Sequence, residues 1–218
     1  MNSPLKAALE YAARGWPVLP LNGKKPMTVN GYKNASTDTA QIRAWWSEHV
    51  DAWVGIVVGE ESGLCVLDVD LRSGGFESLK ELQEANGPLP ETLSVSTAGG
   101  GKHFYFRYAE QAVRSTIAPG LEIKARGGYV VAPPSRNRET GKAYSWDETE
   151  SRELAELPAW LAAFGRSPAK RSARVGWGGD IIEGARNQTL ASLAGQLRGS
   201  GKSEDEIFTA LSNANLAR

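Results

Sequence analysis

The 218-residue sequence predicts an α+β protein. Helix-type and strand-type segments are mixed up to residue 86, whereas strand-type segments follow one another from residue 92 onward. This segregation favours an α+β fold over a doubly wound parallel sheet, in which helices and strands alternate throughout the chain. Hydrophobic residues make up 41% of the chain, which is typical of a globular protein with a packed core.

Helices are expected at three places before residue 87. Ser3 and Pro4 begin the first helix as N-cap and first-turn proline. The second helix begins at Thr37 or Asp38, which are also favoured N-cap residue types. The third, residues 76–85, ends at an Asn-Gly-Pro sequence that cannot continue a helix.

Strands are expected where short apolar or alternating runs are bounded by glycine, proline or asparagine. These runs are residues 16–21, 55–59, 64–70, 92–97, 103–108, 121–124, 129–132 and 143–146. Residues 22–26 read as a loop, and residues 158–164 as a last short helix.

The net charge and the numbers of histidines and cysteines limit the classes of function that the sequence allows. Lysine plus arginine and aspartate plus glutamate each number 25, so the net charge gives no sign of a basic nucleic-acid-binding surface. Nucleic-acid binding stays open, because carboxylates that hold metal ions would offset basic walls in the sum. The only histidines, His49 and His103, are too few for a histidine-based zinc site, and Cys65 is the only cysteine. Without a membrane-length apolar run or a signal peptide, we expect a protein of the reducing cytoplasm.

Two aspartates at the end of an expected strand form the central feature. Asp68 and Asp70 are two residues apart, so in a strand their side chains point to the same face and converge. Neighbouring carboxylates repel unless a cation lies between them, and Mg²⁺ or Mn²⁺ prefers oxygen ligands of this kind. The alternative is a strand end that reaches solvent, where the two aspartates simply begin a turn.

Glu122 is the candidate for a third carboxylate. In the expected strand, Leu121 and Ile123 face one way, while Glu122 and Lys124 face the other. Glu122 would complete a three-carboxylate site for two metal ions, and Lys124 would contact a phosphate. The alternative is an exposed Glu–Lys pair on a sheet surface, which contributes little to stability.

A glycine-rich loop joins two of the expected strands. Gly99, Gly100 and Gly101 allow the backbone to approach a phosphate closely, and Lys102 and His103 add hydrogen-bond donors. A Walker A loop and a dinucleotide-binding fingerprint both need a helix directly after the glycines, and here a strand follows. The alternative is an ordinary glycine-rich hairpin turn.

A Gly-Lys-Ser sequence near the C-terminus does not indicate an ATPase. The position of the first glycine that a Walker A loop requires holds Gln196, and a helix rather than a strand precedes the sequence. Ser203 and Glu206 instead predict a capping box, Ser-x-x-Glu, that begins a helix.

The sequence predicts three parts in the chain. Residues 1–165 form the main domain, and residues 166–180 form a linker that begins with a basic stretch lacking apolar periodicity. Residues 181–218 contain two amphipathic helices, residues 187–198 and 204–217, which are too few to bury a core. We expect this C-terminal helical segment to belong to a truncated domain or to dock on the main domain.

Several motifs in a particular order carry a resemblance to a known family. They are Lys24-Lys25-Pro26, Asp68-Val69-Asp70, His103-Phe104-Tyr105-Phe106, Leu121-Glu122-Ile123-Lys124 and Gly127-Gly128-Tyr129-Val130-Val131-Ala132-Pro133-Pro134-Ser135. With them, residues 5–165 resemble the bifunctional primase–polymerase (Prim-Pol) domain of phage and plasmid replication proteins, in the archaeo-eukaryotic primase superfamily. A shorter stretch from residue 182 is similar to the helical primase C-terminal domain that often follows it.

The resemblance implies an RRM-like catalytic sheet with a small N-terminal α/β unit. It also implies that Asp68, Asp70 and Glu122 hold Mg²⁺ or Mn²⁺, and that His103 contacts the phosphates of the incoming nucleotide. The sequence departs from the family at two positions, because an aspartate is common where Glu122 stands and a serine where Gly101 stands.

The implied activity is template-directed nucleotidyl transfer, as a DNA primase and polymerase with a two-metal mechanism. Its partners would be single-stranded template DNA, dNTP or NTP substrates, and a helicase domain or another replication protein, in the cytoplasm of a bacterial host. Nucleotide contacts are further expected from Gly99, Gly100, Gly101, Lys102, Lys124 and Ser135. Template or nucleotide contacts are expected from Lys24, Lys25, Arg72 and Arg126. Two alternatives stay open, a metal-dependent nuclease and a non-catalytic module that binds single strands or an origin.

Overall fold

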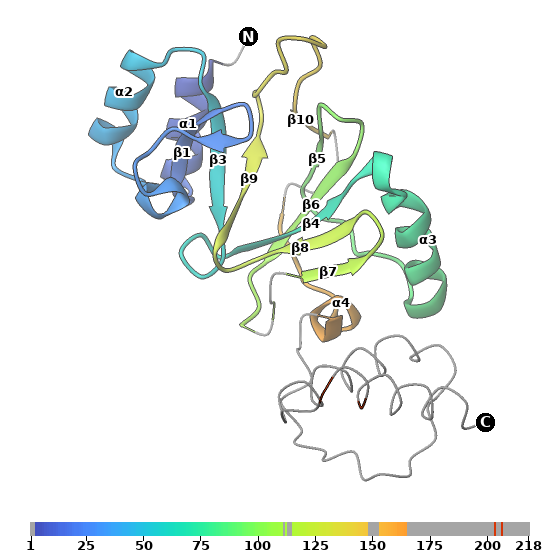
Figure 1. The fold of residues 1–218 in the computed structure, drawn as a ribbon. Helices are drawn as coiled ribbons and strands as arrows, with labels where there is room; N and C mark the ends of the chain where they lie inside the picture. The colour runs from blue at the N-terminus through green and yellow to red at the C-terminus, as the bar shows by residue number, and fades with distance from the viewer. Residues whose placement is uncertain are drawn as a thin grey trace, which may run out of the picture. The chain divides into compact units, whose positions relative to one another are not determined.

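The computed structural model describes residues 3–110, 112, 115–147, 153–164, 203 and 206. Contacts between Cα atoms divide the chain into two compact units, residues 1–167 and 168–218. The first unit has two sheets and an α+β fold, as predicted (Figure 1). No helix in the described ranges combines the length and the apolar character that crossing a bilayer requires.

The first sheet has the strand order β2-β1-β3-β9, and its neighbouring strands are antiparallel. The strands are β1 (Val18–Asn22), β2 (Lys25–Pro26), β3 (Trp53–Val58) and β9 (Gly128–Ala132). The helical elements that accompany it are α1 (Pro4–Ala13), the 3₁₀ helix η1 (Gly31–Asn34) and α2 (Thr39–Glu48).

Both long helices of this layer begin where the sequence provides a cap. Ser3 Oγ accepts a hydrogen bond from Lys6 N at 3.2 Å, and Asp38 Oδ1 accepts one from Gln41 N at 2.7 Å. One face of each helix is buried against the sheet, as the apolar spacing requires. The predicted starts of the first two helices are therefore confirmed.

The second sheet has the strand order β10-β5-β6-β4-β8-β7, and β11 also pairs with β6. Its strands are β4 (Leu64–Val69), β5 (Ser94–Ser96), β6 (Lys102–Arg107), β7 (Ser115–Ala118), β8 (Leu121–Lys124), β10 (Ser145–Trp146) and β11 (Ala155–Glu156). All pairs are antiparallel except β6–β11. The remaining helical elements are the 3₁₀ helix η2 (Leu71–Ser73), α3 (Gly75–Asn86) and α4 (Ala159–Phe164).

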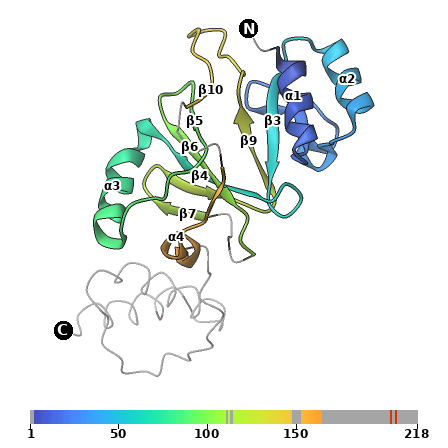
Figure 2. The same ribbon diagram turned by 180° about the vertical axis from the view of Figure 1, so that it is seen from behind.

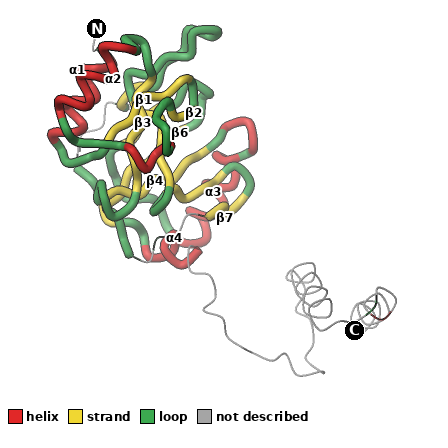
Figure 3. Tube along the Cα trace, turned by 60° about the vertical axis from the view of Figure 1, so that its left-hand side comes forward, coloured by secondary structure: helices red, strands yellow, loops and turns green. Residues whose placement is uncertain are grey.

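The two faces of the second sheet have separate cores, because successive residues of a strand point to opposite sides. Cys65 and Leu67 of β4 belong to the apolar cluster that includes residues of α3 and α4. Val66 belongs to the cluster shared with the first sheet, α1 and α2. Figures 2 and 3 show α3 and α4 on one side of the strands, and α1 and α2 on the other. By alternation Asp68 lies on the same face as Val66, so it looks toward the first sheet.

The structure differs from the sequence prediction in three respects. β4 ends at Val69, so Asp70 lies just beyond the strand instead of within it. The strands β2, β7 and β11 are not predicted, because two to four residues carry too little periodicity. The runs that form β3 and β4 follow each other across a tight turn, yet they belong to different sheets.

In the second unit the structure describes Ser203 and Glu206. Ser203 N donates a hydrogen bond to Glu206 Oε2 at 2.9 Å, and Glu206 N donates one to Ser203 Oγ at 3.3 Å. This reciprocal pair is the predicted capping box, which is confirmed. The linker over residues 166–180 and the first C-terminal helix, over residues 187–198, lie outside the described residues, as does almost all of the second.

Candidate functional site

Asp68 is in register with two of the other candidate residues. In the antiparallel pairing of β4 with β6 its Cα partner is His103, and in the pairing of β4 with β8 its partner is Glu122. Direct cross-strand partners point to the same face of a sheet. Val66 pairs with Lys124 in the same way, which adds the lysine to that face. The strands β4, β6 and β8 therefore bring residues from three segments of the sequence together on one face of the sheet: Asp68, His103, Glu122 and Lys124.

The ammonium of Lys124 lies between the two carboxylates. Lys124 Nζ is 2.5 Å from Glu122 Oε2 and 3.6 Å from Asp68 Oδ2. The three side chains are 17%, 31% and 29% exposed, so the charges are only partly solvated. Like charges directly opposite each other destabilise a sheet, and the lysine offsets that repulsion here.

His103 lies on the other side of Asp68. Its Nε2 is 3.5 Å from Asp68 Oδ1, and its side chain is 8% exposed. Burial lowers the pKa of His103 to about 4, although the charge of Asp68 acts to raise it and those of Lys124 and Lys24 lower it further. The imidazole is therefore neutral at pH 7, and it can donate one hydrogen bond and accept another.

A pocket of about 400 Å³ lies over these residues, between the two sheets. It is lined by Lys24, Tyr32, Asp68, His103, Lys124, Gly127, Gly128, Tyr129, Val130, Val131 and Tyr144. The first sheet and its loops thus supply one cationic side chain, and β8 supplies the other. Two cationic side chains and a hydrogen-bonding imidazole suit a ligand that carries phosphates.

Aromatic rings form one wall of this pocket. The rings of Tyr32 and Tyr129 are stacked with centroids 6.4 Å apart, and Tyr129 Oη donates a hydrogen bond to the carbonyl oxygen of Lys24 at 2.8 Å. Gly127 has a φ of +82°, and a Cβ built on it would lie 3.5 Å from Tyr32 Oη. The wall therefore presents rings and bare backbone, which suits a flat apolar group such as a base.

Asp70 lies just beyond β4 and caps the 3₁₀ helix that follows. Its Oδ1 accepts a hydrogen bond from Arg72 N at 2.9 Å, and Ser73 Oγ donates one to its Oδ2 at 3.2 Å. It is thus the N-cap of η2 and is exposed. Each carboxylate oxygen has two acceptor sites, so capping leaves the side chain able to bind a further cation.

The donor types of these residues fit a hard divalent ion. Asp68 and Glu122 offer carboxylate oxygens on one face, and a cation, the Lys124 ammonium, already lies between them. Within the described ranges, no three His, Cys, Asp or Glu side chains are grouped closely enough to hold a metal ion as they stand. With the side chains in these positions, the Lys124 ammonium rather than a metal ion lies between the carboxylates of Asp68 and Glu122.

Lys102 lies on the opposite face of β6 from His103. Its ammonium is 2.9 Å from Asp147 Oδ2, and Ser94 Oγ and Ser96 Oγ each donate a hydrogen bond to that carboxylate at 2.6 Å. Burial raises the pKa of Asp147, but these hydrogen bonds and the Lys102 charge outweigh it and hold the pKa below its usual value. Lys102 therefore belongs to a structural cluster outside the pocket.

The glycine run is also used for packing. A Cβ at Gly101 would lie 2.2 Å from the carbonyl oxygen of Val69, and Gly100 has a φ of +87°. Gly101 thus allows the hairpin to lie directly against β4, and Gly100 makes the turn. Gly99 has no such restriction, since a Cβ there would approach nothing closer than 3.8 Å. None of the three glycines lines the pocket.

The other expected contacts lie away from the pocket, apart from Lys24. Ser135 is buried, and its Oγ accepts a hydrogen bond from Val54 N at 2.9 Å. Arg126 forms an exposed ion pair with Glu60. Lys25 and Arg72 are exposed side chains that do not line the pocket.

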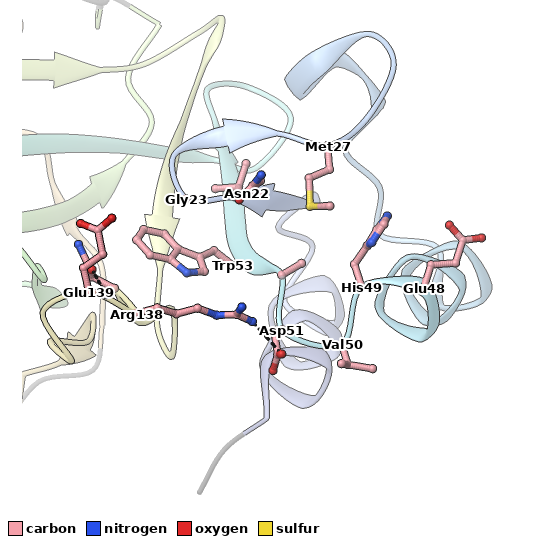
Figure 4. Close-up of a pocket in the computed structure, with 13 residues that line it drawn as sticks. Asn22, Gly23, Met27, Glu48, His49, Val50, Asp51, Trp53, Arg138 and Glu139 are labelled. Carbon is pink, nitrogen blue, oxygen red and sulfur yellow. Dashed lines mark hydrogen bonds and ion pairs between the residues drawn. The ribbon is translucent and has the colours of Figure 1, made fainter.

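A second, larger cavity of about 620 Å³ lies beside the loop between α2 and β3 (Figure 4). Its lining includes the carboxylates of Glu48, Asp51 and Glu139 and the guanidinium of Arg138. Arg138 Nη2 is 2.7 Å from Asp51 Oδ2, so that positive charge is already paired. An acidic lining repels phosphates, and the pocket over Asp68 is the better site for them.

Sequence reasoning missed the aromatic wall and the acidic end of the structural cluster. Tyr32, Tyr129 and Tyr144 lie in different segments, so no local motif groups them. Asp147 follows a two-residue strand with no motif around it.

An α+β fold with an aspartate, a histidine and two lysines around one pocket defines a protein suited to a phosphate-bearing ligand. Residues 8–160 match the family described as bifunctional DNA primase/polymerase, N-terminal, and residues 178–218 match primase C terminal 1. The first match covers more than half of the chain, so the protein belongs to the bifunctional DNA primase/polymerase family. The two domains support a primase and polymerase role in DNA replication, with template DNA and nucleotides as binding partners. A search of curated proteins found no match.

Proposed function

We propose that the pocket over Asp68 catalyses template-directed nucleotidyl transfer with Mg²⁺ or Mn²⁺. The observation that carries this proposal is the register of Asp68 with both Glu122 and His103 on the face that lines the pocket. The setting that we propose is phage or plasmid replication in a bacterial cytoplasm, with a helicase or another replication protein as partner.

Asp68, Asp70 and Glu122 would hold the metal ions. Bound there, the ions would neutralise charge on the phosphates and lower the pKa of the attacking hydroxyl. Asp68 and Glu122 already attract a cation, because their carboxylates flank the Lys124 ammonium. Asp70 lies two residues beyond Asp68 on an exposed turn, where its side chain is accessible.

The chain's own residues would position the triphosphate. Lys124 and Lys24 bring positive charge from opposite walls of the pocket, and His103 adds a neutral hydrogen-bond donor. Phosphoryl transfer depends mainly on positioning and charge neutralisation, so these residues need no covalent role. With the phosphates at Lys124, the base would lie against the rings of Tyr32 and Tyr129.

A primer-extension assay with labelled dNTPs, a single-stranded template and Mn²⁺ tests the proposal. We expect extension by the wild type, and a loss of roughly two to three orders of magnitude in Asp68→Asn, because a ligand to the catalytic metal is removed. Asp51→Asn is the matched control, since Asp51 is a carboxylate in an exposed ion pair outside the pocket. Cleavage of the template without extension would instead indicate a nuclease.

A further inference from the structure

Two neighbouring side chains of β6, His103 and Tyr105, each carry a buried polar atom. His103 Nδ1 and Tyr105 Oη are buried, and neither has a hydrogen-bond partner among the described residues. Both residues are on β6, two positions apart, so their side chains point to the same face. Their ring centroids are 6.4 Å apart. Buried polar atoms of native proteins are nearly always hydrogen-bonded, because an unpaired one costs free energy.

The hydrogen-bonding needs of the two atoms are complementary. His103 Nε2 faces the Asp68 carboxylate, which only accepts hydrogen bonds when ionised, so Nε2 carries the proton in the neutral ring. Nδ1 then has a lone pair that lacks a donor, and the Tyr105 hydroxyl is a donor. In a protonated ring Nδ1 would donate instead, and the hydroxyl oxygen would accept. The pairing works in either protonation state.

Two polar groups near Tyr105, the indole nitrogen of Trp146 and the hydroxyl of Tyr11, already have hydrogen-bond partners. Tyr105 is 0% exposed, and its ring packs against that of Trp146 with centroids 5.2 Å apart. Trp146 Nε1 donates a hydrogen bond to Tyr11 Oη at 3.0 Å, and Tyr11 Oη donates one to the carbonyl oxygen of Pro133 at 2.7 Å. The hydroxyl of Tyr105 is thus enclosed in the core, on the same face of β6 as the unpaired nitrogen of His103.

We propose that Tyr105 is a positioning residue whose hydroxyl hydrogen-bonds to His103 Nδ1, directly or through one water, and so directs Nε2–H toward the pocket. This hydrogen bond between Tyr105 and His103 can be tested whether or not the proposed function is correct. Its effect on nucleotide binding rests on the function proposed above for His103. Tyr105 does not line the pocket, so it would act on the nucleotide only through the imidazole.

Nitrogen NMR of the histidine rings tests the contact, because the chain has only two histidines. His49 is exposed and serves as an internal reference. In Tyr105→Phe, we expect the Nδ1 resonance of His103 to move toward that of a nitrogen without a hydrogen bond, while the His49 resonances stay in place. Tyr11→Phe is the matched control, since it removes a buried hydroxyl that has other partners. An equal movement in both variants would overturn the assignment.

Thermal unfolding is a second test, because the Tm of Tyr105→Phe differs according to whether the Tyr105 hydroxyl has a hydrogen-bond partner. If the hydroxyl bonds to His103, Tyr105→Phe leaves Nδ1 unpaired and lowers the Tm. If the hydroxyl has no partner, the variant removes a costly buried group, and the Tm stays the same or rises. An unchanged His103 resonance together with an equal or higher Tm would overturn the proposal.

Nucleotide kinetics separate this proposal from the proposed function. We expect Tyr105→Phe to raise the KM for the nucleotide by about fivefold, the factor expected for the loss of one ordinary hydrogen bond, with a smaller change in kcat. If the His103 resonance moves but the KM does not, the hydrogen bond is upheld, and the role of His103 in nucleotide binding is overturned.

Discussion

Asp68 and Glu122 lie directly opposite each other on the antiparallel strands β4 and β8. Two acidic residues at such a position repel each other, and the sheet tolerates them because the Lys124 ammonium contacts both carboxylates. The pair thus creates a place on the pocket face where the fold requires a cation. In the nucleotidyl transfer that we propose, cations at this place would offset the negative charges of the phosphates.

Removing the lysine should make the folded protein depend on added metal. We expect Lys124→Met to lower the free energy of unfolding by about 1–2 kcal/mol without metal, because the two carboxylates lose their shared cation. Mn²⁺ should restore more stability in this variant than in the wild type. Urea unfolding with and without Mn²⁺ measures both effects. The matched control is Lys102→Met, whose ammonium pairs with Asp147 on the opposite face. An equal response of both variants to Mn²⁺ would contradict the expectation.

Tyr32 should affect nucleotide affinity through its ring. We expect Tyr32→Ala to raise the KM by roughly tenfold or more for all four nucleotides, the effect expected for one lost base–aromatic contact. Tyr32→Phe should behave like the wild type, because it keeps the ring stacked on Tyr129. Steady-state kinetics with each nucleotide test this. A loss in the phenylalanine variant would mean that the hydroxyl, not the ring, makes the contact.

The glycine loop should matter for folding more than for binding. We expect Gly101→Ala to destabilise the protein by about 1–3 kcal/mol, because its Cβ would clash with the Val69 carbonyl oxygen. Gly99→Ala should change neither stability nor nucleotide affinity, since its Cβ would come no closer than an ordinary van der Waals contact of 3.8 Å. Chemical denaturation and nucleotide titration distinguish the two. If a stable Gly99→Ala variant bound nucleotide more weakly, the result would contradict this prediction and indicate that the glycine loop contacts the phosphates.

Asp147 should make stability depend on pH in the acid range. Its pKa is held below the ordinary value of 3.8, so it stabilises the folded protein at pH values above that value. This contribution is lost as the pH falls below 3.8 through the folded-state pKa. We expect Asp147→Asn to be less stable than the wild type at pH 7 and the difference to shrink toward pH 3. Unfolding curves at both pH values measure it, and a constant difference would contradict the role of the charge.

The sequence predicts most of the fold because its elements carry local signals. The N-caps at Ser3 and Asp38 and the alternation of the long strands are visible without a structure. Strands of two to four residues are not, because their formation depends on pairing with strands distant in the sequence. The separation of β3 and β4 into two sheets is equally non-local.

The candidate site is predicted only in part for the same reason. Alternation places Glu122 and Lys124 on one face, but only the register of β4 with β8 brings them to Asp68. The motif containing Lys102 and His103 suggests a shared role, yet adjacent residues of a strand point apart, and only His103 enters the pocket. Lys24, in the loop between β1 and β2, lines the pocket because residues of both sheets surround it.

Mn²⁺ binding measured by electron paramagnetic resonance tests the central claim most directly. In the presence of a nucleotide, we predict that the wild type binds Mn²⁺ and that Asp68→Asn and Glu122→Gln each weaken this binding by at least about tenfold, while Asp51→Asn does not. If the Asp68 and Glu122 variants bind Mn²⁺ as tightly as the wild type, the two carboxylates do not form a metal site.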